Sequence, residues 1–296
     1  MADPINILVT GGQGQIGQAL AKVRWAPGVN LLRPTRAELD LTDPEALNAC
    51  FERQPFHAVI NAAAFTAVDL AETHVGDAML SNALVPARLA DLTRRADIPL
   101  VHISTDFVFD GESDHPYAEH DPANPINVYG ASKRAGELAV LSGHPRGVVV
   151  RTAWVVSARG RNFARKILEA AAHQDVLSVV ADTIGSPTSA DDLARALETV
   201  TTAMISDPSA PTGVYHCVNA GQASWAELAT ELVGLAGLAT TVVAIPAAQY
   251  PSSARRPRNS RLSCGRLYSD HGVTMRDWRT ALADVVSEIE RERLRS

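Results

Sequence analysis

Short apolar runs alternate with longer segments of helical periodicity through the first half of the chain. The apolar runs predict strands at residues 5–10, 30–33, 58–61, 100–104 and 147–152. Helical patterns lie between them, among them residues 77–96 and 129–141 and one that begins at Asp43-Pro44-Glu45. Strands that are apolar throughout and alternate with helices predict a parallel sheet covered on both faces, which is a doubly wound α/β fold.

The alternation loosens after about residue 155. Helical patterns are predicted at 162–173, 190–205, 225–235 and 279–292, and short strands at 178–180, 215–218 and 241–245. Loops that carry Pro and Gly separate these elements, and no clean linker marks a boundary. We therefore expect a first domain at residues 1–155 and a smaller, mixed α/β lobe at 156–296, either separate from the first or interleaved with it.

The composition narrows the class of protein. The chain has 296 residues, a charged fraction of 20% and a net charge of −6. That length buries a sizeable core without disulfides, and the acidic balance argues against a nucleic-acid binder. Cys50, Cys217 and Cys264 form no metal-ligand pattern, which is typical of buried thiols in a reducing compartment. With no signal-peptide pattern and no apolar run of membrane length, we expect a soluble cytoplasmic protein with no membrane partner.

A glycine-rich segment follows the first predicted strand and opens the first helix. Gly11, Gly14 and Gly17 have the spacing of a dinucleotide-binding loop. The first glycine permits a tight turn, the second lets the backbone approach a pyrophosphate, and the third allows the helix to pack closely on the strand. The segment predicts a Rossmann-type nucleotide-binding domain in residues 1–155.

The end of the second predicted strand bears on the choice of cofactor. NAD-binding domains usually place an acidic residue there, which binds the ribose 2′-hydroxyl. Residues 32–36 contain Arg33 and Arg36 and no acidic residue. Because arginine favours a 2′-phosphate, NADPH is the predicted cofactor, with NADH as the alternative.

Tyr129 and Lys133 lie four residues apart in a predicted helix, so their side chains share one face. A phenol is a weak acid at neutral pH, and a neighbouring ammonium group stabilises its phenolate. Ser104-Thr105-Asp106 ends the fourth predicted strand, at the edge where open α/β sheets place their sites. A hydroxyl at this edge is placed to donate to a substrate carbonyl. Together with the glycine loop, these groups predict catalysis by an oxidoreductase.

A series of motifs runs in order almost from end to end of the chain, at residues 11–17, 61–69, 104–111, 125–133, 151–155, 162–163, 185–188, 215–216 and 256–260. In this series the sequence resembles the extended short-chain dehydrogenase/reductases and, within them, the dTDP-4-dehydrorhamnose reductase family. The resemblance implies NADPH-dependent reduction of the C4 ketone of a dTDP-4-keto-6-deoxy sugar, with dTDP-4-dehydro-L-rhamnose as substrate and dTDP-L-rhamnose as product.

The resemblance also implies roles for individual residues. Tyr129 would protonate the developing alkoxide, Lys133 would lower the tyrosine pKa and bind the nicotinamide ribose, and Thr105 would hydrogen-bond the carbonyl oxygen. Besides the three glycines and two arginines, the implied cofactor contacts are Gln15 and Ile16 at the pyrophosphate, Asp40 and Leu41 at the adenine, and Ala63, Ala64 and Thr66 at the middle of the cofactor. The implied substrate contacts are Thr105, Asp106, Val68, Asp69, Trp154, Arg256 and Asn259, and a place in the core is the alternative for Trp154.

Three positions depart from the family pattern. Phe107 and Val156 stand where related proteins often carry Tyr, so two hydroxyls near the sugar are missing and the identity of the sugar stays open. Ala19 occupies the neighbourhood in which relatives that dimerise through magnesium carry an acidic residue. We therefore expect no structural metal.

Other functions of the same superfamily are alternatives. A 4,6-dehydratase needs an acidic residue after the Thr–Asp pair, where this sequence has Phe107. A sugar-nucleotide 4-epimerase keeps NAD tightly bound, whereas Arg33 and Arg36 favour exchangeable NADPH. A non-catalytic NADP-binding regulatory subunit would share the fold. The sequence leaves open the nucleotide, the configuration at C4, and whether the protein is a monomer or a homodimer.

Overall fold

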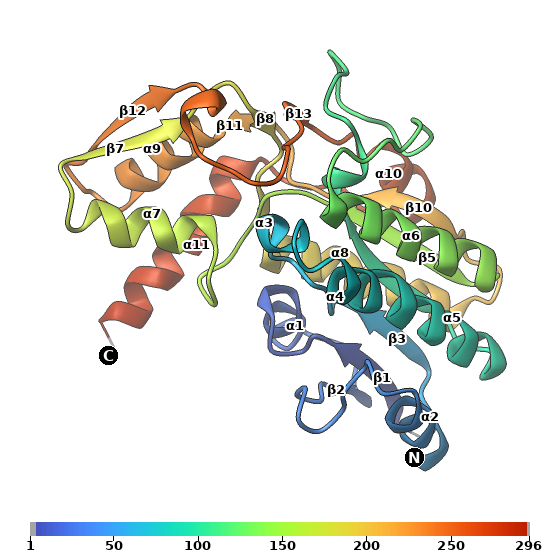
Figure 1. Ribbon diagram of the computed structural model, residues 1–296. Coiled ribbons are helices and arrows are strands. Elements are labelled where there is room, and N and C mark those ends of the chain that lie inside the picture. Colours follow the sequence, from blue (N-terminus) through green and yellow to red (C-terminus); the bar gives the residue numbers. More distant parts are fainter. Residues whose placement is uncertain (1–3, 295–296) are drawn as a thin grey trace.

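A six-stranded parallel sheet forms the centre of the larger lobe in the computed structural model, which describes residues 4–294 (Figure 1). The strand order is β10-β5-β4-β3-β1-β2, and every pairing is parallel. The strands are β1 (Ile5–Thr10), β2 (Val29–Leu32), β3 (Ala58–Asn61), β4 (Leu100–Thr105), β5 (Gly147–Thr152) and β10 (Gly213–His216). The predicted doubly wound α/β fold is confirmed.

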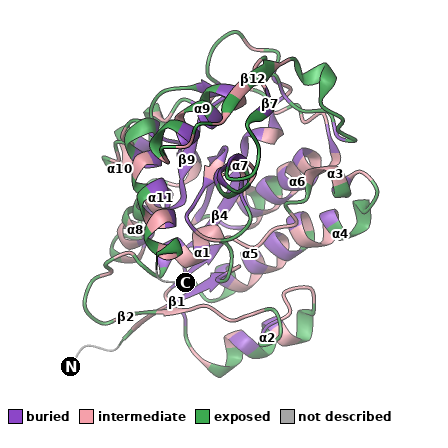
Figure 2. Ribbon diagram, turned by 90° about the vertical axis from the view of Figure 1, so that its left-hand side faces the viewer, coloured by how far each residue is buried: buried purple, intermediate pink, exposed green. Residues whose placement is uncertain are grey.

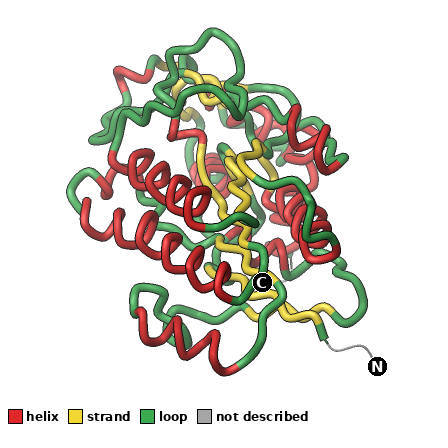
Figure 3. Tube along the Cα trace, turned by 90° about the vertical axis from the view of Figure 1, so that its right-hand side faces the viewer, coloured by secondary structure: helices red, strands yellow, loops and turns green. Residues whose placement is uncertain are grey.

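Helices cover both faces of this sheet (Figure 3). One face carries α1 (Gln15–Leu20) and α8 (Ala190–Ser206), and the other carries α2 (Pro44–Arg53), α5 (Val85–Arg95) and α6 (Val128–Gly143). Successive strand residues face opposite sides, so Ile7 and Ile60 pack in the core beneath α8, whereas Leu8 and Val59 pack beneath α5. In Figure 2 the central strands are purple and the outward faces of the surrounding helices are green.

The helical pattern at 77–96 forms a continuous run in three parts. It consists of α4 (Val75–Met79), a π-helical segment (Leu80–Leu84) and α5. Asn82 in the π-helical segment is fully buried; its amide accepts from the Phe65 N–H at 2.8 Å and donates to the Phe65 carbonyl at 3.0 Å and to the Ser132 hydroxyl at 2.9 Å. The widened turn therefore holds the loop after β3, which leads into α3 (Val68–Ala71), against α6.

A smaller lobe of mixed structure lies beside the carboxyl edge of the sheet (Figure 1). Its elements are β6 (Val155–Val156), α7 (Phe163–Ala171), β7 (Val176–Val180), β8 (Ile184–Gly185), β9 (Thr188–Ser189), β11 (Ala223–Ser224), α9 (Trp225–Leu235), β12 (Thr241–Ile245), a 3-10 turn (Ala247–Gln249), β13 (Asn259–Ser260) and α11 (Trp278–Arg293). Strands β7 and β12 pair in parallel, and β11, β8 and β13 form a small mixed sheet.

The chain returns to the main sheet after entering the smaller lobe. Helix α8 packs on α1, and β10 pairs with β5 at the edge of the six-stranded sheet. Helix α10 (Gly265–His271) then packs against both β10 and α8. Residues beyond 156 therefore contribute to both lobes. Within residues 4–294, no helix is both long and apolar enough to cross a bilayer.

Candidate active site

The first turn of α6 packs against the turn that follows β4. This contact brings the predicted catalytic residues together. Asn127 caps the helix, with its side-chain oxygen accepting from the Gly130 N–H at 2.7 Å. This cap places Tyr129 in the first turn and Lys133 one turn later. Tyr129 meets Phe107, which follows β4, edge to face, with 5.6 Å between the ring centroids.

Thr105 and Asp106 lie beside Tyr129 at the carboxyl end of β4, and both are buried. The Thr105 hydroxyl donates to Asp106 Oδ1 at 3.0 Å and accepts from the Phe107 N–H at 3.2 Å. These contacts fix the threonine side chain at the edge of the sheet where the tyrosine lies. The structure thus brings Thr105, Asp106 and Tyr129 together, as the sequence predicts.

The surroundings of Tyr129 keep its phenol protonated. Burial raises the pKa of Tyr129 to about 12; a hydrogen bond with Thr105 opposes this shift, and the charge of Asp106 adds to it. Burial also raises the pKa of Asp106 to about 6, against hydrogen bonds from Ser260 and Thr105. At neutral pH Tyr129 therefore holds the proton that a general acid must give.

Lys133 is almost fully buried, and its amine lies against β4. Lys133 Nζ donates to the Ile103 carbonyl at 2.6 Å and lies 3.3 Å from His102 Nε2. Burial lowers the pKa of Lys133 to about 8, although the charge of Glu137 opposes this shift. A lowering of the Tyr129 pKa by Lys133, which the resemblance implies, stays a prediction for the complex with the cofactor.

The glycine loop is closed tightly between β1 and β3. Gly11 has a φ of +68°, and a Cβ at this position would lie 2.7 Å from backbone atoms of Ala62 and Ala63. A Cβ at Gly17 would lie 2.5 Å from the Gly11 carbonyl oxygen. Side chains at these positions would therefore collide with backbone, at Gly11 with the loop after β3 and at Gly17 with the glycine loop itself.

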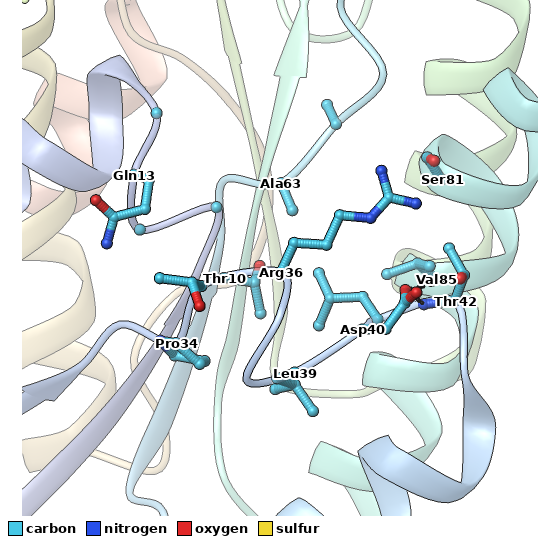
Figure 4. A pocket seen from close by; sticks show the side chains of 16 residues that line it. Thr10, Gln13, Pro34, Arg36, Leu39, Asp40, Thr42, Ala63, Ser81 and Val85 are labelled. Atoms are coloured by element: carbon cyan, nitrogen blue, oxygen red, sulfur yellow. Dashed lines mark hydrogen bonds between the residues drawn. The ribbon is translucent and has the colours of Figure 1, made fainter.

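A cavity of about 260 Å³ opens next to this loop (Figure 4). Its lining combines the glycine loop, the end of β2, the segment before α2 and the π-helical segment; the predicted residues in it are Gly11, Gly14, Arg36, Asp40, Leu41, Ala63 and Ala64. The Arg36 side chain extends across the cavity in Figure 4. Asp40 accepts from the Thr42 backbone N–H at 2.9 Å and from its hydroxyl at 2.7 Å, which holds the 40–42 turn at the rim.

Other predicted cofactor contacts surround the cavity without lining it. Arg33 packs against Gly12 and donates to its carbonyl at 3.4 Å. Gln15 has a buried side-chain oxygen with no hydrogen-bond partner among the described residues, and Ile16 packs against the core beneath α8. Thr66 is exposed in the loop before α3.

The relationship to known proteins extends over almost the whole chain. A family model described as the RmlD substrate binding domain matches residues 5–291. A dTDP-4-dehydrorhamnose reductase of Burkholderia thailandensis is 41% identical over 96% of this chain and 99% of its own length. The chain belongs to the dTDP-4-dehydrorhamnose reductase family.

Solved structures of this reductase family have the same fold. A dTDP-4-dehydrorhamnose reductase from Clostridium acetobutylicum superposes with a TM-score of 0.92 at 34% identity, covering 97% of this chain and 100% of that one. A dTDP-4-dehydrorhamnose reductase from Bacillus anthracis, solved in complex with NADP, gives a TM-score of 0.91 at 30% identity, covering 96% and 99%.

The substrate-side residues implied by the reductase resemblance occupy two different places. Trp154 lies in the core of the smaller lobe, only 8% exposed, and stacks on Trp225 with 3.5 Å between centroids. Its backbone φ is +49°, a left-handed conformation that is uncommon for a bulky residue. Asn259 is buried, and its amide donates to the Ser113 and His115 carbonyls at 2.8 Å each.

Asp69 and Arg256, in contrast, form a partly exposed ion pair between α3 and the segment before β13. Arg256 Nη2 lies 2.6 Å from Asp69 Oδ2, and the Ala254 N–H donates to Asp69 Oδ1 at 3.0 Å. Burial works against ionisation of Asp69, but hydrogen bonds from Ala254 and Arg256 lower its pKa to about 2. Val68, half-buried, precedes Asp69 at the start of α3.

Some features of this reductase site have no signal in the motifs. Ser81 of the π-helical segment and Val85, the first residue of α5, also line the cofactor cavity. Gly130 and Gly136 let α6 approach its neighbours, since a Cβ would lie 2.0 Å from the Phe107 carbonyl oxygen at Gly130 and 2.1 Å from the Asn82 carbonyl oxygen at Gly136. A helix interior normally disfavours glycine, and Gly130 and Gly136 are the available signal for this close packing.

Proposed function

We propose that this protein reduces the C4 ketone of dTDP-4-dehydro-L-rhamnose with NADPH and releases dTDP-L-rhamnose. Its family membership supports the substrate class. The observation that carries the assignment to catalysis is the placement of a protonated Tyr129 beside Thr105 at the carboxyl end of β4. A purely regulatory protein has no need of this arrangement.

The residues around the glycine loop fit a dinucleotide. The cavity reaches from the end of β2 to the loop after β3, and Gly11 lets the glycine loop approach that second loop, since a Cβ would lie 2.7 Å from its backbone. Gly11, Gly14 and Gly17 with Gln15 and Ile16 would hold the pyrophosphate, and Asp40 and Leu41 the adenine. Arg36, with Arg33 beside it, would bind the 2′-phosphate, and Ala63, Ala64 and Thr66 would border the middle of the cofactor. NADPH, when bound, supplies the hydride.

The protein's own groups act on the carbonyl oxygen. Thr105 would turn its hydroxyl from Asp106 to this oxygen, in a hydrogen bond that strengthens as negative charge develops, so the contact favours the transition state over the ground state. Tyr129 transfers its phenolic proton to the same oxygen and completes the alcohol. Lys133, as an ammonium ion on the same helix face, binds the nicotinamide ribose and stabilises the tyrosinate that remains.

The implied substrate-side residues would bind the rest of the substrate. Arg256 is the cation placed to meet the diphosphate. On binding, the diphosphate would displace Asp69 from Arg256 or would bind Arg256 together with Asp69. Trp154 would contribute an apolar face to the deoxysugar next to Asp106 and Val68. Asn259 would act by holding the 113–115 loop, since both of its amide N–H groups already bind carbonyls there.

The test follows NADPH absorbance with dTDP-4-dehydro-6-deoxyglucose as the starting sugar, with and without the 3,5-epimerase that converts it to dTDP-4-dehydro-L-rhamnose. We expect NADPH consumption only when the epimerase is present, with dTDP-L-rhamnose as product. Consumption without the epimerase would assign a different 4-keto sugar. No consumption in either reaction, with a folded protein that binds NADPH, would contradict the reductase assignment.

A further inference from the structure

A chain of buried polar side chains links the first strand of the sheet to Lys133. Thr10 Oγ1 donates to Asn61 Oδ1 at 2.6 Å, and Asn61 Nδ2 lies 2.9 Å from His102 Nδ1. His102 Nε2 in turn lies 3.3 Å from Lys133 Nζ. None of these four side chains is more than 2% exposed. His102 takes no part in the proposed proton transfer.

The backbone fixes the orientation of the Asn61 amide. The Ala63 N–H, which can only donate, points at Asn61 Oδ1 at 3.2 Å. The oxygen of the amide therefore lies on the Ala63 side, and the NH₂ group faces His102. Because an amide NH₂ can only donate, His102 Nδ1 accepts this hydrogen bond and carries no proton.

The tautomer of His102 follows from this contact. Burial, together with the charge of Lys133, lowers the pKa of His102 well below its usual range, so the imidazole is neutral and has one N–H. With Nδ1 accepting from Asn61, the proton sits on Nε2, which faces Lys133. The imidazole thus presents a donor, and not an acceptor, to the lysine.

An ammonium group has only N–H bonds, so a charged Lys133 at this position would set two donors against each other at 3.3 Å. An uncharged amine fits both neighbours. Its lone pair accepts from His102 Nε2–H, and one of its N–H bonds donates to the Ile103 carbonyl at 2.6 Å. The position that Lys133 occupies against β4, here called the retracted position, therefore suits the amine.

We propose that His102 is a positioning residue for Lys133, because its Nε2–H admits only the uncharged amine to the retracted position and leaves the ammonium form on the Tyr129 side of α6. The inference rests on the proposed function, in which charged Lys133 binds the nicotinamide ribose. When the amine leaves the retracted position for the Tyr129 side of α6, it takes up one proton from solvent. His102 keeps its Nε2 proton throughout.

Few other ionisable groups act on this contact. Glu137 lies one turn further along α6, where the Arg151 guanidinium from β5 holds it with two hydrogen bonds of 2.8 Å, and Arg134 makes a third at 2.8 Å. Tyr129 lies one turn earlier and is a neutral phenol. The pKa of Lys133, lowered by burial to about 8, places both lysine forms within an accessible pH range.

The lysine content makes a direct measurement simple, because Lys22, Lys133 and Lys166 are the three lysines of the sequence. In protein labelled with ¹⁵N-lysine and free of nucleotide, the Nζ shift of Lys133 should titrate near pH 8, below the usual range of a lysine amine. His102→Asn keeps an acceptor for Asn61 but removes Nε2–H, so it should raise the Lys133 midpoint by about one unit, a tenfold change in the acid constant. An unchanged or lowered midpoint in a folded variant would overturn the proposal.

His144→Asn is the matched control. His144 is also buried; its Nδ1 accepts from the Arg146 N–H at 3.1 Å and its Nε2 lies 2.8 Å from the Ile98 carbonyl, which gives the same tautomer away from Lys133. This variant should leave the Lys133 midpoint unchanged. Imidazole ¹⁵N shifts of the unmodified protein provide a test that needs no variant: a proton on Nδ1 of His102 would refute the proposal. Neither measurement uses nucleotide or sugar, so both can be interpreted even if the reductase assay fails.

Discussion

The Cα atom of Gly130 lies so close to Phe107 that a Cβ on it would stand 2.0 Å from the Phe107 carbonyl oxygen. The first turn of α6 therefore rests directly on the turn that follows β4. Since Tyr129 and Thr105 belong to these two segments, this glycine sets the distance between the proposed acid and the proposed carbonyl ligand.

Gly130→Ala should therefore lower the catalytic rate far more than the addition of one methyl group would suggest. The helix start must move away from Phe107, and a displacement of about 1 Å at the reacting groups can cost ~10²-fold in rate. Gly143→Ala, at the other end of α6, is the control, because its Cβ would make an ordinary 3.6 Å contact with Ala90. Steady-state kinetics of both variants test this; equal rates would show that the close approach is not required.

Tyr129→Phe should preserve folding and NADPH binding but lower kcat by about 10²–10⁴-fold, the usual contribution of general acid catalysis. The phenylalanine keeps the edge-to-face contact with Phe107 and removes only the proton donor. Tyr268→Phe removes an exposed hydroxyl and should leave kcat unchanged. A Tyr129→Phe enzyme with the turnover of the parent protein would exclude Tyr129 as the acid.

Replacing both Arg33 and Arg36 by Ala should lower the preference for NADPH over NADH at least tenfold. Each charged hydrogen bond to the 2′-phosphate contributes about 1.5–3 kcal/mol, and NADH lacks that phosphate. Arg36→Ala alone should account for most of the change, because Arg36 lines the cavity whereas Arg33 packs on Gly12. Binding titrations with both cofactors measure this. A similar loss for NADPH and NADH would mean that another group selects the cofactor.

Trp154→Ala should lower the free energy of unfolding by about 3–5 kcal/mol, because it removes a buried ring stacked on Trp225. It should also raise KM for the nucleotide sugar, while Trp154→Phe, which retains a stacking ring, should show smaller changes in both quantities. Denaturant unfolding and kinetics are measured on the same preparations. A large loss of stability with an unchanged KM would limit Trp154 to its place in the core.

Asp106 should make the folded protein less stable as the pH rises. Burial raises its pKa from 3.8 to about 6 in the folded state, so between these values the folded chain binds more protons than the unfolded chain. The contribution of Asp106 to the free energy of unfolding therefore falls as the pH rises from about 4 to about 6. Asp106→Asn should remove this dependence, and the exposed Asp175→Asn should not. Denaturant titrations across this pH range make the comparison.

The parts of the fold that depend on local sequence were predictable. An apolar run is enough to mark β1, and Asp43 with Pro44 is enough to mark the start of α2. The predicted strand at 215–218 corresponds to β10, but its pairing with β5 depends on residues more than 60 positions away. The π-helical turn was predicted as ordinary helix, because its widening depends on the contacts of Asn82 with Phe65 and Ser132.

The same distinction applies to the site. The order of the motifs points to Tyr129 and Thr105, because each lies in a short segment whose residue types and spacing are recognisable in the sequence. The contact of His102 with Lys133 joins a strand to a helix and has no spacing that a motif could report. The burial of Trp154 against Trp225 likewise joins residues some 70 positions apart.

The position of β10 has a consequence for how the protein is made. Helix α1 lacks its covering helix until residues 190–206 have been synthesised, and the edge of β5 stays unpaired until residues 213–216 have been synthesised after them. The nucleotide-binding half therefore cannot complete its sheet on the ribosome while only the N-terminal half has emerged. Cells that express the chain must protect this unpaired strand edge until about three quarters of the sequence has been synthesised. A gene fragment that stops near residue 155 would encode a sheet whose unpaired β5 edge can pair with other chains and aggregate.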